Sequence, residues 1–290
     1  MPYRTILVHL DNTVQAMQRV RVAALLARTP GCHVIGAALT GVSRLLYQRT
    51  PAGDPDAYLA LHLAFLRERA VEAVAGFRRA AEANALRSFE GRVIDDDAGA
   101  GLALHGRVAD LVLLSQAGEP HPKGGEPDFR PYVLLHSGRP VLMLPAGLND
   151  AFDPGQLTRR VLVAWDASRE AGSALQGALP LLRQAERVSI AVFDDGPGGR
   201  TMLDAGSADP LPFLARHGVR ATLEVHAAGR GRARIARDSI GEALLMQAAD
   251  EGASLLVMGA YGHSRLRETI LGSVTRTVLA TSKLPVLMEH

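Results

Sequence analysis

The sequence predicts an α/β fold made of two tandem, doubly wound parallel sheets, each with five strands and helices on both faces. One observation is that short apolar runs alternate with Ala-rich helical patterns along the chain, as in parallel sheets with right-handed helical crossovers. A second is that the two halves match each other. RTILVHLDNT corresponds to RRVLVAWDAS, ADLVLLSQAG to ASLLVMGAYG, and HSGRPVLMLP to TSKLPVLMEH. Such a duplication indicates two copies of one fold.

The composition is typical of buried parallel strands and excludes several classes of protein. Hydrophobic residues make up 47% of the 290 residues but aromatic residues only 4%, so Val, Leu, Ile and Ala must build the cores. A net charge of +2 argues against nucleic-acid binding through bulk charge. The single cysteine, Cys32, excludes an internal disulfide and is expected to be a buried thiol. Without a long apolar signal core or a run of ~18 apolar residues, we expect a cytoplasmic protein.

The first half is expected to contain five apolar strands, at Thr5–Leu10, Cys32–Leu39, Phe89–Ile94, Asp110–Ser115 and Pro140–Leu144. Helical patterns lie between them at Val14–Ala27, Asp56–Ala85, Gly99–Arg107 and Tyr132–Ser137. The longest helix places Leu59, Leu63, Leu66, Ala70 and Val74 on one stripe, which predicts a core-facing side. Its arginines are expected to form a solvated face.

The second half restarts the pattern after Pro145–Leu157, a predicted linker rich in turn-forming residues. Its strands are expected at Arg160–Trp165, Val188–Phe193, Ala221–His226, Ser254–Met258 and Pro285–Met288. Its helices are expected at Ser168–Gln184, Pro210–His217, from Ser239 onward, and at Gly272–Ser282. Glu242 follows Ser239 by three residues, as in a capping box. We therefore predict two domains, 1–147 and 158–290.

One stretch of the second half has the pattern of a phosphate-binding loop. The apolar run Leu255–Met258 stops at Gly259, Gly262 follows, and Gly272-Ser273 opens a helix. Glycines after a buried strand let backbone amides approach a ligand, and a helix start offers unpaired N–H groups to an anion. Single glycines also simply punctuate turns, so the hypothesis depends on the ordered set.

Other polar residues are predicted to converge with this stretch, because ligands of such sheets lie beyond the carboxyl ends of the strands. Asp166 ends the first strand of the second half, and the second strand ends near Asp194-Asp195. These acids could hold ribose or Mg²⁺, or only form turns. Trp165, beside Asp166, is expected to pack next to the site rather than stack on a base, and His226 is expected to be structural.

The second half resembles the universal stress protein family, through VAWDAS at its first strand, VMGAYG with GSV nine residues later, and the closing KLPVL. The resemblance covers the chain as a tandem pair, strongly in the second half and weakly in the first. It implies sheets of strand order 3-2-1-4-5 and binding of ATP, with or without Mg²⁺. It also implies the site residues Ala164, Asp166, Val192 and Met258 around adenine and ribose, and Gly259, Gly262, Gly272, Ser273 and Val274 around ribose and phosphates. His263 and Arg265 lie inside the glycine loop and are further candidates for phosphate contact.

The first half departs from this pattern. Asp11 and Gly118 are kept, but Ser115 stands where the first glycine of the motif is expected, and Pro127-Asp128 stands near the position of the Gly-Ser pair. Proline offers no N–H, and a carboxylate repels phosphate. We therefore expect a degenerate domain that does not bind ATP in the family's way.

The remaining features favour a binding protein over an enzyme. No Walker lysine, Ser-His-Asp order or metal-ligand spacing is present in the sequence. The loop Gly229–Arg237 carries four arginines that either clamp phosphates or an acidic partner, or are simply solvated. We expect a nucleotide-dependent switch in the stress response, with an unidentified protein partner and no nucleic acid or membrane partner. The alternatives are a nucleotide-free scaffold and a slow ATPase. Pro285–Met288 resembles the edge through which family members pair, and would join the two halves or two chains.

Overall fold

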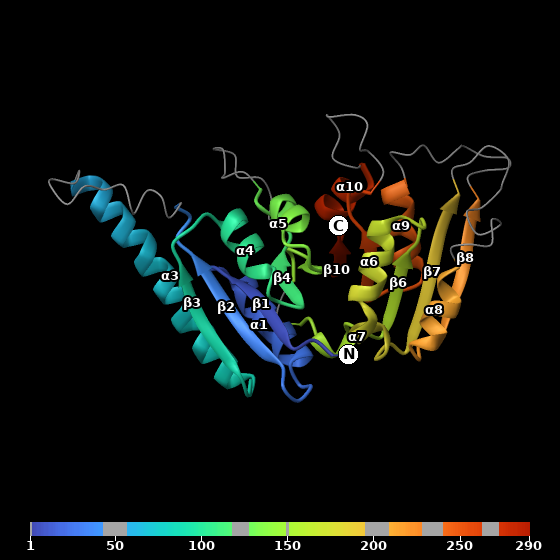
Figure 1. The fold of residues 1–290 in the computed structure, drawn as a ribbon, viewed down its shortest axis with the longest axis horizontal. Coiled ribbons are helices and arrows are strands. Elements are labelled where there is room, and N and C mark those ends of the chain that lie inside the picture. The colour runs from blue at the N-terminus through green and yellow to red at the C-terminus, as the bar shows by residue number, and fades with distance from the viewer. Residues whose placement is uncertain are drawn as a thin grey trace. The chain divides into compact units, whose positions relative to one another are not determined.

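The computed structural model describes residues 2–42, 57–117, 128–148, 151–194, 209–227, 240–262 and 273–290. The chain divides into two compact units. One contains Pro2–Val141 and Leu148–Pro154, and the other contains Leu142–Gly147 and Gly155–His290. In both repeats strands alternate with helices, as Figure 1 shows. The domain limits 1–147 and 158–290 stay a prediction.

The first repeat contains the strands β1 (Thr5–Leu10), β2 (His33–Leu39), β3 (Phe89–Ile94), β4 (Leu111–Ser115) and β5 (Val141–Leu144). Their hydrogen-bonded order is β3-β2-β1-β4-β5. The pairs β1–β2, β2–β3 and β1–β4 are parallel, with Ile6 opposite both Val34 and Leu111. The predicted α/β class and strand order are therefore confirmed here.

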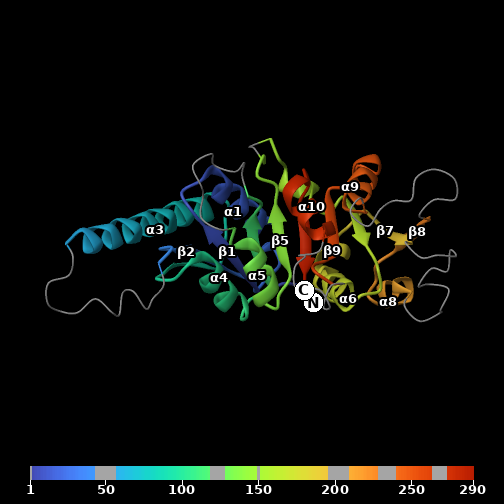
Figure 2. The ribbon, with the colours of Figure 1, turned by 90° about the horizontal axis from the view of Figure 1, so that it is seen from above.

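Helices cover both faces of this first sheet. The helices α1 (Val14–Leu26) and α3 (Ala57–Ala83) lie on one face, and α4 (Ala98–Gly106) and α5 (Arg130–His136) lie on the other (Figure 2). Phe77 of α3 is fully buried against the sheet, where Gly36 and Gly91 leave room for its ring. A Cβ atom at Gly36 would lie 2.8 Å from that ring. Residues of the predicted stripe, among them Leu63, Ala70 and Val74, are buried as expected.

The second repeat contains the strands β6 (Arg160–Ala164), β7 (Arg187–Asp194), β8 (Ala221–Ala227), β9 (Leu255–Gly259) and β10 (Val286–Glu289). Their order, β8-β7-β6-β9-β10, again follows the predicted 3-2-1-4-5 pattern, and the four pairs are parallel. The helices are α6 (Arg169–Gly177), α7 (Leu179–Leu182), α8 (Pro210–Arg216), α9 (Ile240–Asp250) and α10 (Ser273–Thr281). The linker contains the short 3-10 helix η1 (Pro154–Gln156).

One predicted element is wrong in detail. The sequence pattern predicts one helix over Ser168–Gln184, but the structure has α6 and α7, separated at Ala178. Pro180 explains the break, because proline lacks the N–H that would continue the helix and its ring clashes with the preceding turn. Within the described residues, no helix is long and apolar enough to cross a membrane.

Candidate functional site

The carboxyl ends of β6, β7 and β9 bring the first group of predicted residues to one edge of the second sheet. Ala164 lies opposite Ala191, next to Val192, and Val163 lies opposite Val257, next to Met258. Val192 and Met258 are each 5% exposed, whereas Asp166 is exposed beyond the end of β6. These residues lie far apart in the sequence, and the parallel pairing of β6 with β7 and β9 brings them close together.

The turn after β6 is fixed by local hydrogen bonds. Asp166 accepts a hydrogen bond from the Ser168 amide at 3.0 Å, and the intervening Ala167 has a positive φ of 57°. Ser168 then caps α6, with its hydroxyl oxygen accepting from the Ala171 amide at 3.0 Å. Asp166 therefore forms the turn that starts α6, and its contact with a ribose or base stays a prediction.

Gly259, the last residue of β9, and Gly262 after it both pack against the first turn of α6. A Cβ atom at Gly259 would lie 2.5 Å from the Ala171 amide nitrogen, which is too close for any side chain. At Gly262 it would lie 3.0 Å from the Glu170 Oε2 atom and 3.4 Å from the Ser168 hydroxyl. Sequence reasoning assigned these glycines to ligand approach, and the structure adds a packing requirement. Space for α6 by itself demands glycine at Gly259.

The buried carboxylate of Glu170 is a feature that sequence reasoning missed. Its side chain is 8% exposed and pairs at 3.2 Å with Arg169, whose own side chain is 65% exposed. The internal duplication could have drawn attention to Glu170, because the corresponding residue of the first repeat is the uncharged Gln15. Glu170 thus places a carboxylate directly against the glycine loop.

The start of α10 completes the described part of this site. Tyr261 has a positive φ of 60°, and its amide donates to the Thr275 hydroxyl at 3.2 Å, which links the end of β9 to the first turn of α10. Ser273 and Val274, the first two residues of α10, are both partly exposed. A helix start of this kind presents backbone N–H groups to an anion. The candidates His263, Arg265 and Gly272 lie outside the described residues.

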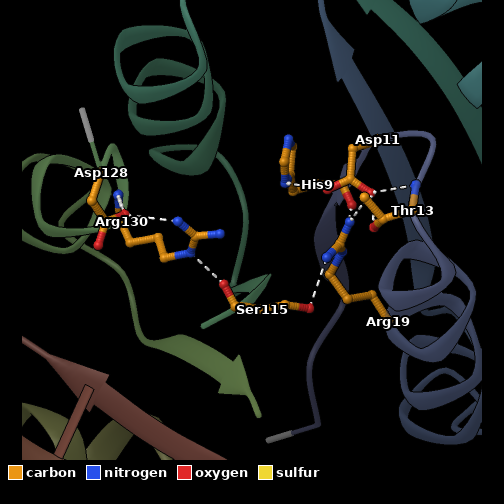
Figure 3. A network of polar contacts seen from close by, with 7 residues as sticks. All are labelled: His9, Asp11, Thr13, Arg19, Ser115, Asp128 and Arg130. Carbon is orange, nitrogen blue, oxygen red and sulfur yellow. Dashed lines mark hydrogen bonds and ion pairs between the residues drawn. The ribbon is translucent and has the colours of Figure 1, made fainter. Parts of the chain in front are cut away.

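The same edge of the first repeat is filled by an arginine. Figure 3 shows Arg19 of α1 reaching between Asp11 and Ser115. Its guanidinium lies 2.9 Å from the Asp11 carboxylate and donates to the His9 carbonyl and the Ser115 hydroxyl, both at 2.7 Å. Arg19 is only 1% exposed. A buried guanidinium is tolerated because these contacts compensate its loss of water.

A second arginine approaches Ser115 from α5 (Figure 3). Arg130 donates from Nε to the Ser115 carbonyl and from Nη1 to Asp128 at 2.8 Å. Its guanidinium also lies 4.8 Å from the centre of the Phe129 ring, which packs edge-on against His9 at 5.1 Å. The two arginines and the two carboxylates balance in charge, so this internal network carries no net charge.

Comparison of the repeats shows what the network replaces. The strand registers and the duplicated sequence align His9, Arg19, Ser115, Asp128 and Arg130 with Ala164, Ala174, Gly259, Ser273 and Thr275, respectively. At every one of these positions the first repeat has the larger side chain. In the first repeat, larger side chains therefore fill the region at the strand ends that is lined by small residues in the second repeat.

Burial and the neighbouring charges shift the protonation equilibria of this network. Burial, reinforced by the Arg19 charge, lowers the pKa of His9 to about 3, so the imidazole is neutral at physiological pH. Burial alone would raise the pKa of Asp11, but the Arg19 charge and hydrogen bonds from Thr13 outweigh it and lower the pKa. Asp11 is thus held as a carboxylate that matches the Arg19 guanidinium.

Several other predicted residues are placed by the structure. Cys32 is 5% exposed, as expected, and burial raises the pKa of its thiol to about 11. His226 stacks on Phe193 with ring centres 5.0 Å apart, and the Trp165 amide donates to the Ala191 carbonyl at 2.9 Å. No group of three His, Cys, Asp or Glu side chains suited to a metal occurs among the described residues. Asp195 and the segment Gly229–Arg237 fall in the gaps between the described ranges.

Comparison with known proteins identifies relatives of the second repeat and of the whole fold. Residues 158–290 match the model of the universal stress protein family. A universal stress protein from Synechocystis sp. is 31% identical over 188 residues, which cover 61% of this chain and 57% of that protein. One from Methanocaldococcus jannaschii is 43% identical over 47 residues, covering 16% of this chain and 29% of the relative. The matches thus span less than two thirds of either relative's length.

A solved structure extends the likeness of fold to the full chain. The crystal structure of a universal stress protein from Archaeoglobus fulgidus superimposes with a TM-score of 0.67. The match covers 99% of this chain and 98% of that one, at 18% sequence identity. This structure shows that the fold with two repeats is shared along the whole length.

Proposed function

Because the chain belongs to the universal stress protein family through its second repeat, we propose that this repeat binds an adenine nucleotide, ATP in particular, as a regulatory signal. The observation that supports the proposal most directly is that the carboxyl ends of β6, β7 and β9 lie at one edge of the sheet, where the end of β9 contacts the start of α10. Tyr261 makes that connection by donating to Thr275 at 3.2 Å. An apolar strand edge beside a helix start suits a ligand with a flat base and an anionic tail.

The site residues divide into two groups by chemistry. The base and ribose would contact the residues at the strand ends, namely Ala164, Asp166, Val192 and Met258. The phosphates would contact backbone amides and polar groups of the glycine loop and of α10, namely Gly259, Gly262, His263, Arg265, Gly272, Ser273 and Val274. Mg²⁺, when bound, would neutralise phosphate charge. The residues of this chain bind and orient the nucleotide, and we assign none of them a role in its cleavage.

We further propose that each chain binds one nucleotide. In the first repeat Arg19 and Arg130 both contact Ser115, and Asp128 stands where Ser273 begins α10. The Asp128 carboxylate would repel phosphate, and the buried Arg19 takes the place of the small Ala174. The first repeat would then serve as a stable partner of the nucleotide-responsive repeat.

Calorimetric titration with ATP in the presence of Mg²⁺ tests the proposal. We expect a stoichiometry of about one per chain, and Gly272→Asp should abolish binding because it adds a carboxylate at the phosphate position. Ser115→Gly, which restores a glycine in the first repeat at the position of Gly259, should leave the stoichiometry unchanged because Arg19 still fills that region. Equal binding by Gly272→Asp and the natural protein, or binding by neither, would sink the proposal and favour a nucleotide-free scaffold. Phosphate release in the same samples would identify a slow ATPase.

A further inference from the structure

Three arginines lie side by side across the amino edge of the second sheet. Arg160 at the start of β6 is opposite Arg187 at the start of β7. Arg220 comes directly before Ala221, the partner of Val188, so it falls opposite Arg187 in turn. Figure 1 shows β6, β7 and β8 next to one another. Paired residues point to the same face and neighbouring strands are about 4.8 Å apart, so the three side chains form one row, here called the arginine row.

No carboxylate among the described residues pairs with this row. All three arginines are exposed, and the guanidinium groups of Arg187 and Arg220 make no ion pair or hydrogen bond with any residue in the described ranges. Arg160 donates to the backbone carbonyl of Glu251 at 3.1 Å, while the Glu251 carboxylate accepts a hydrogen bond from Ser189. Like charges on adjacent strands repel each other and destabilise a sheet. The arginine row therefore lowers the stability of the repeat that contains it.

Further cationic groups flank the row at the same edge. Arg183, directly after α7, donates from Nε to the His217 carbonyl at 2.9 Å, and its Nη2 atom lies 3.1 Å from the Nδ1 atom of the His217 ring. Arg216, in the last turn of α8, is exposed. The neighbouring Glu186 pairs with Arg159 at 3.4 Å, so these two charges cancel each other. The edge as a whole is strongly positive.

The first repeat has uncharged or acidic residues at the matching positions. By the strand registers, the row is replaced there by Thr5, His33 and Ser88. The His33 Nδ1 atom lies 2.7 Å from the Ser88 hydroxyl, within hydrogen-bond distance. Asp110 takes the place of Ser254 and accepts from the Thr5 amide at 2.9 Å. The fold thus does not require arginines here, and the matching row of the first repeat finds its partners within the chain.

We propose that the arginine row is a docking surface for an acidic helix of a partner protein, with Glu or Asp side chains along one face. Arginine binds carboxylates through charge-assisted hydrogen bonds, often two at once. Side chains three or four residues apart on a helix are about 5–6 Å apart, close to the ~4.8 Å spacing of the row. The inference does not depend on nucleotide binding, because the row lies at the opposite ends of the strands from the proposed nucleotide site.

A nucleic acid fits this surface less well than an acidic helix. Single strands bind to exposed aromatic rings on which their bases stack. Phe213, the aromatic residue of α8, is partly buried and packs on His217 with ring centres 4.5 Å apart. A net charge of +2 for the whole chain also gives little long-range attraction for a polyanion.

Fluorescence anisotropy with a labelled peptide tests the surface on the full-length protein. The probe is an alanine-based helical peptide with glutamate at every fourth position, and its glutamine counterpart is the uncharged control. The natural protein should bind the glutamate peptide at low salt, release it as salt screens the charges, and not bind the glutamine peptide. The double variant Arg187→Gln/Arg220→Gln should bind about tenfold more weakly. Arg78→Gln/Arg79→Gln, which removes the same charge from exposed positions of α3, should bind like the natural protein.

Thermal unfolding followed by Trp165 fluorescence gives a second readout. Because the charges of the row repel one another, Arg187→Gln/Arg220→Gln should keep the natural midpoint or raise it by about 1–3 °C. A lower midpoint would show that the row stabilises the fold, and would overturn the proposal.

The binding results can also overturn it. Equal binding of the glutamate peptide by Arg187→Gln/Arg220→Gln and the natural protein, or binding by neither, would do so. An equal loss in Arg78→Gln/Arg79→Gln would mean that only overall charge matters. Tighter binding of a single-stranded or duplex oligonucleotide than of the peptide, lost in Arg187→Gln/Arg220→Gln, would identify a nucleic-acid surface instead.

Discussion

Replacement of Arg19 by alanine should destabilise the first repeat strongly. The change removes two hydrogen bonds, to the His9 carbonyl and the Ser115 hydroxyl, and leaves both buried acceptors short of a donor. Each loss costs about 1 kcal/mol or more. The ion pair with Asp11 adds at most about 1 kcal/mol, because the Asp11 side chain is 34% exposed and water replaces part of the interaction. The total is about 3 kcal/mol.

The single tryptophan gives this prediction a sharp assay. Trp165 lies in the second repeat, so its fluorescence reports that unit, whereas circular dichroism reports both. For a unit of this size, about 3 kcal/mol corresponds to a midpoint lower by roughly 6–12 °C. We expect the dichroism curve of Arg19→Ala to gain an earlier transition while the Trp165 transition stays in place. The exposed Arg28→Ala is the matched control and should change stability by less than about 0.5 kcal/mol.

Two results would refute the reasoning. A shift below about 1 kcal/mol would mean that the Arg19 network contributes no more than an exposed ion pair. An equal shift of the Trp165 transition would mean that the effect is not confined to the first repeat. Arg19→Met, which keeps the length and apolar stem but not the charge, separates packing from polar contacts: recovery of full stability would show that packing alone matters.

Three further predictions concern single residues. Gly259→Ala should destabilise the second repeat by about 1–3 kcal/mol, because its Cβ would lie 2.5 Å from the Ala171 amide nitrogen. As the control, a Cβ at Gly172 meets no atom within 4 Å, so Gly172→Ala should be neutral or stabilising. An unchanged unfolding midpoint of Gly259→Ala, followed by Trp165 fluorescence, would contradict this packing. The pKa of His9 is lowered to about 3 in the folded state, so the unfolded state binds the extra proton and stability should fall by about 1 kcal/mol per pH unit from its unfolded pKa of roughly 6.5 down to about 3. His9→Gln should flatten that part of the stability–pH curve, and an unchanged slope would rule the assignment out. Cys32, with a pKa raised to about 11, should react with iodoacetamide at pH 8 only slowly until the chain unfolds, and rapid native labelling would contradict its burial.

The duplicated pattern was sufficient to predict the fold class, because each strand is a local apolar run and parallel order follows from the alternation of strands and helices. β1 begins and ends where the pattern predicts, and β3 does as well. The apolar stripe alone overestimated one helix: Pro180 splits it into α6 and α7, and the sequence already contained this signal because proline lacks the N–H that continues a helix. The candidate residues of the strand ends could be named because chain position places them at one edge of the sheet.

The contacts that give each repeat its character depend on tertiary structure. Arg19 and Ser115 are 96 positions apart, and no periodicity of α1 distinguishes an arginine that enters the sheet edge from one in solvent. In the same way, Glu170 meets Gly262 only because α6 packs beside the end of β9. The sequence by itself determined the repeated α/β architecture and the loss of the glycine motif in the first half. The tertiary structure decided which side chains fill the first site and which charge faces the second, because burial and long-range contact set the energy of a charged group.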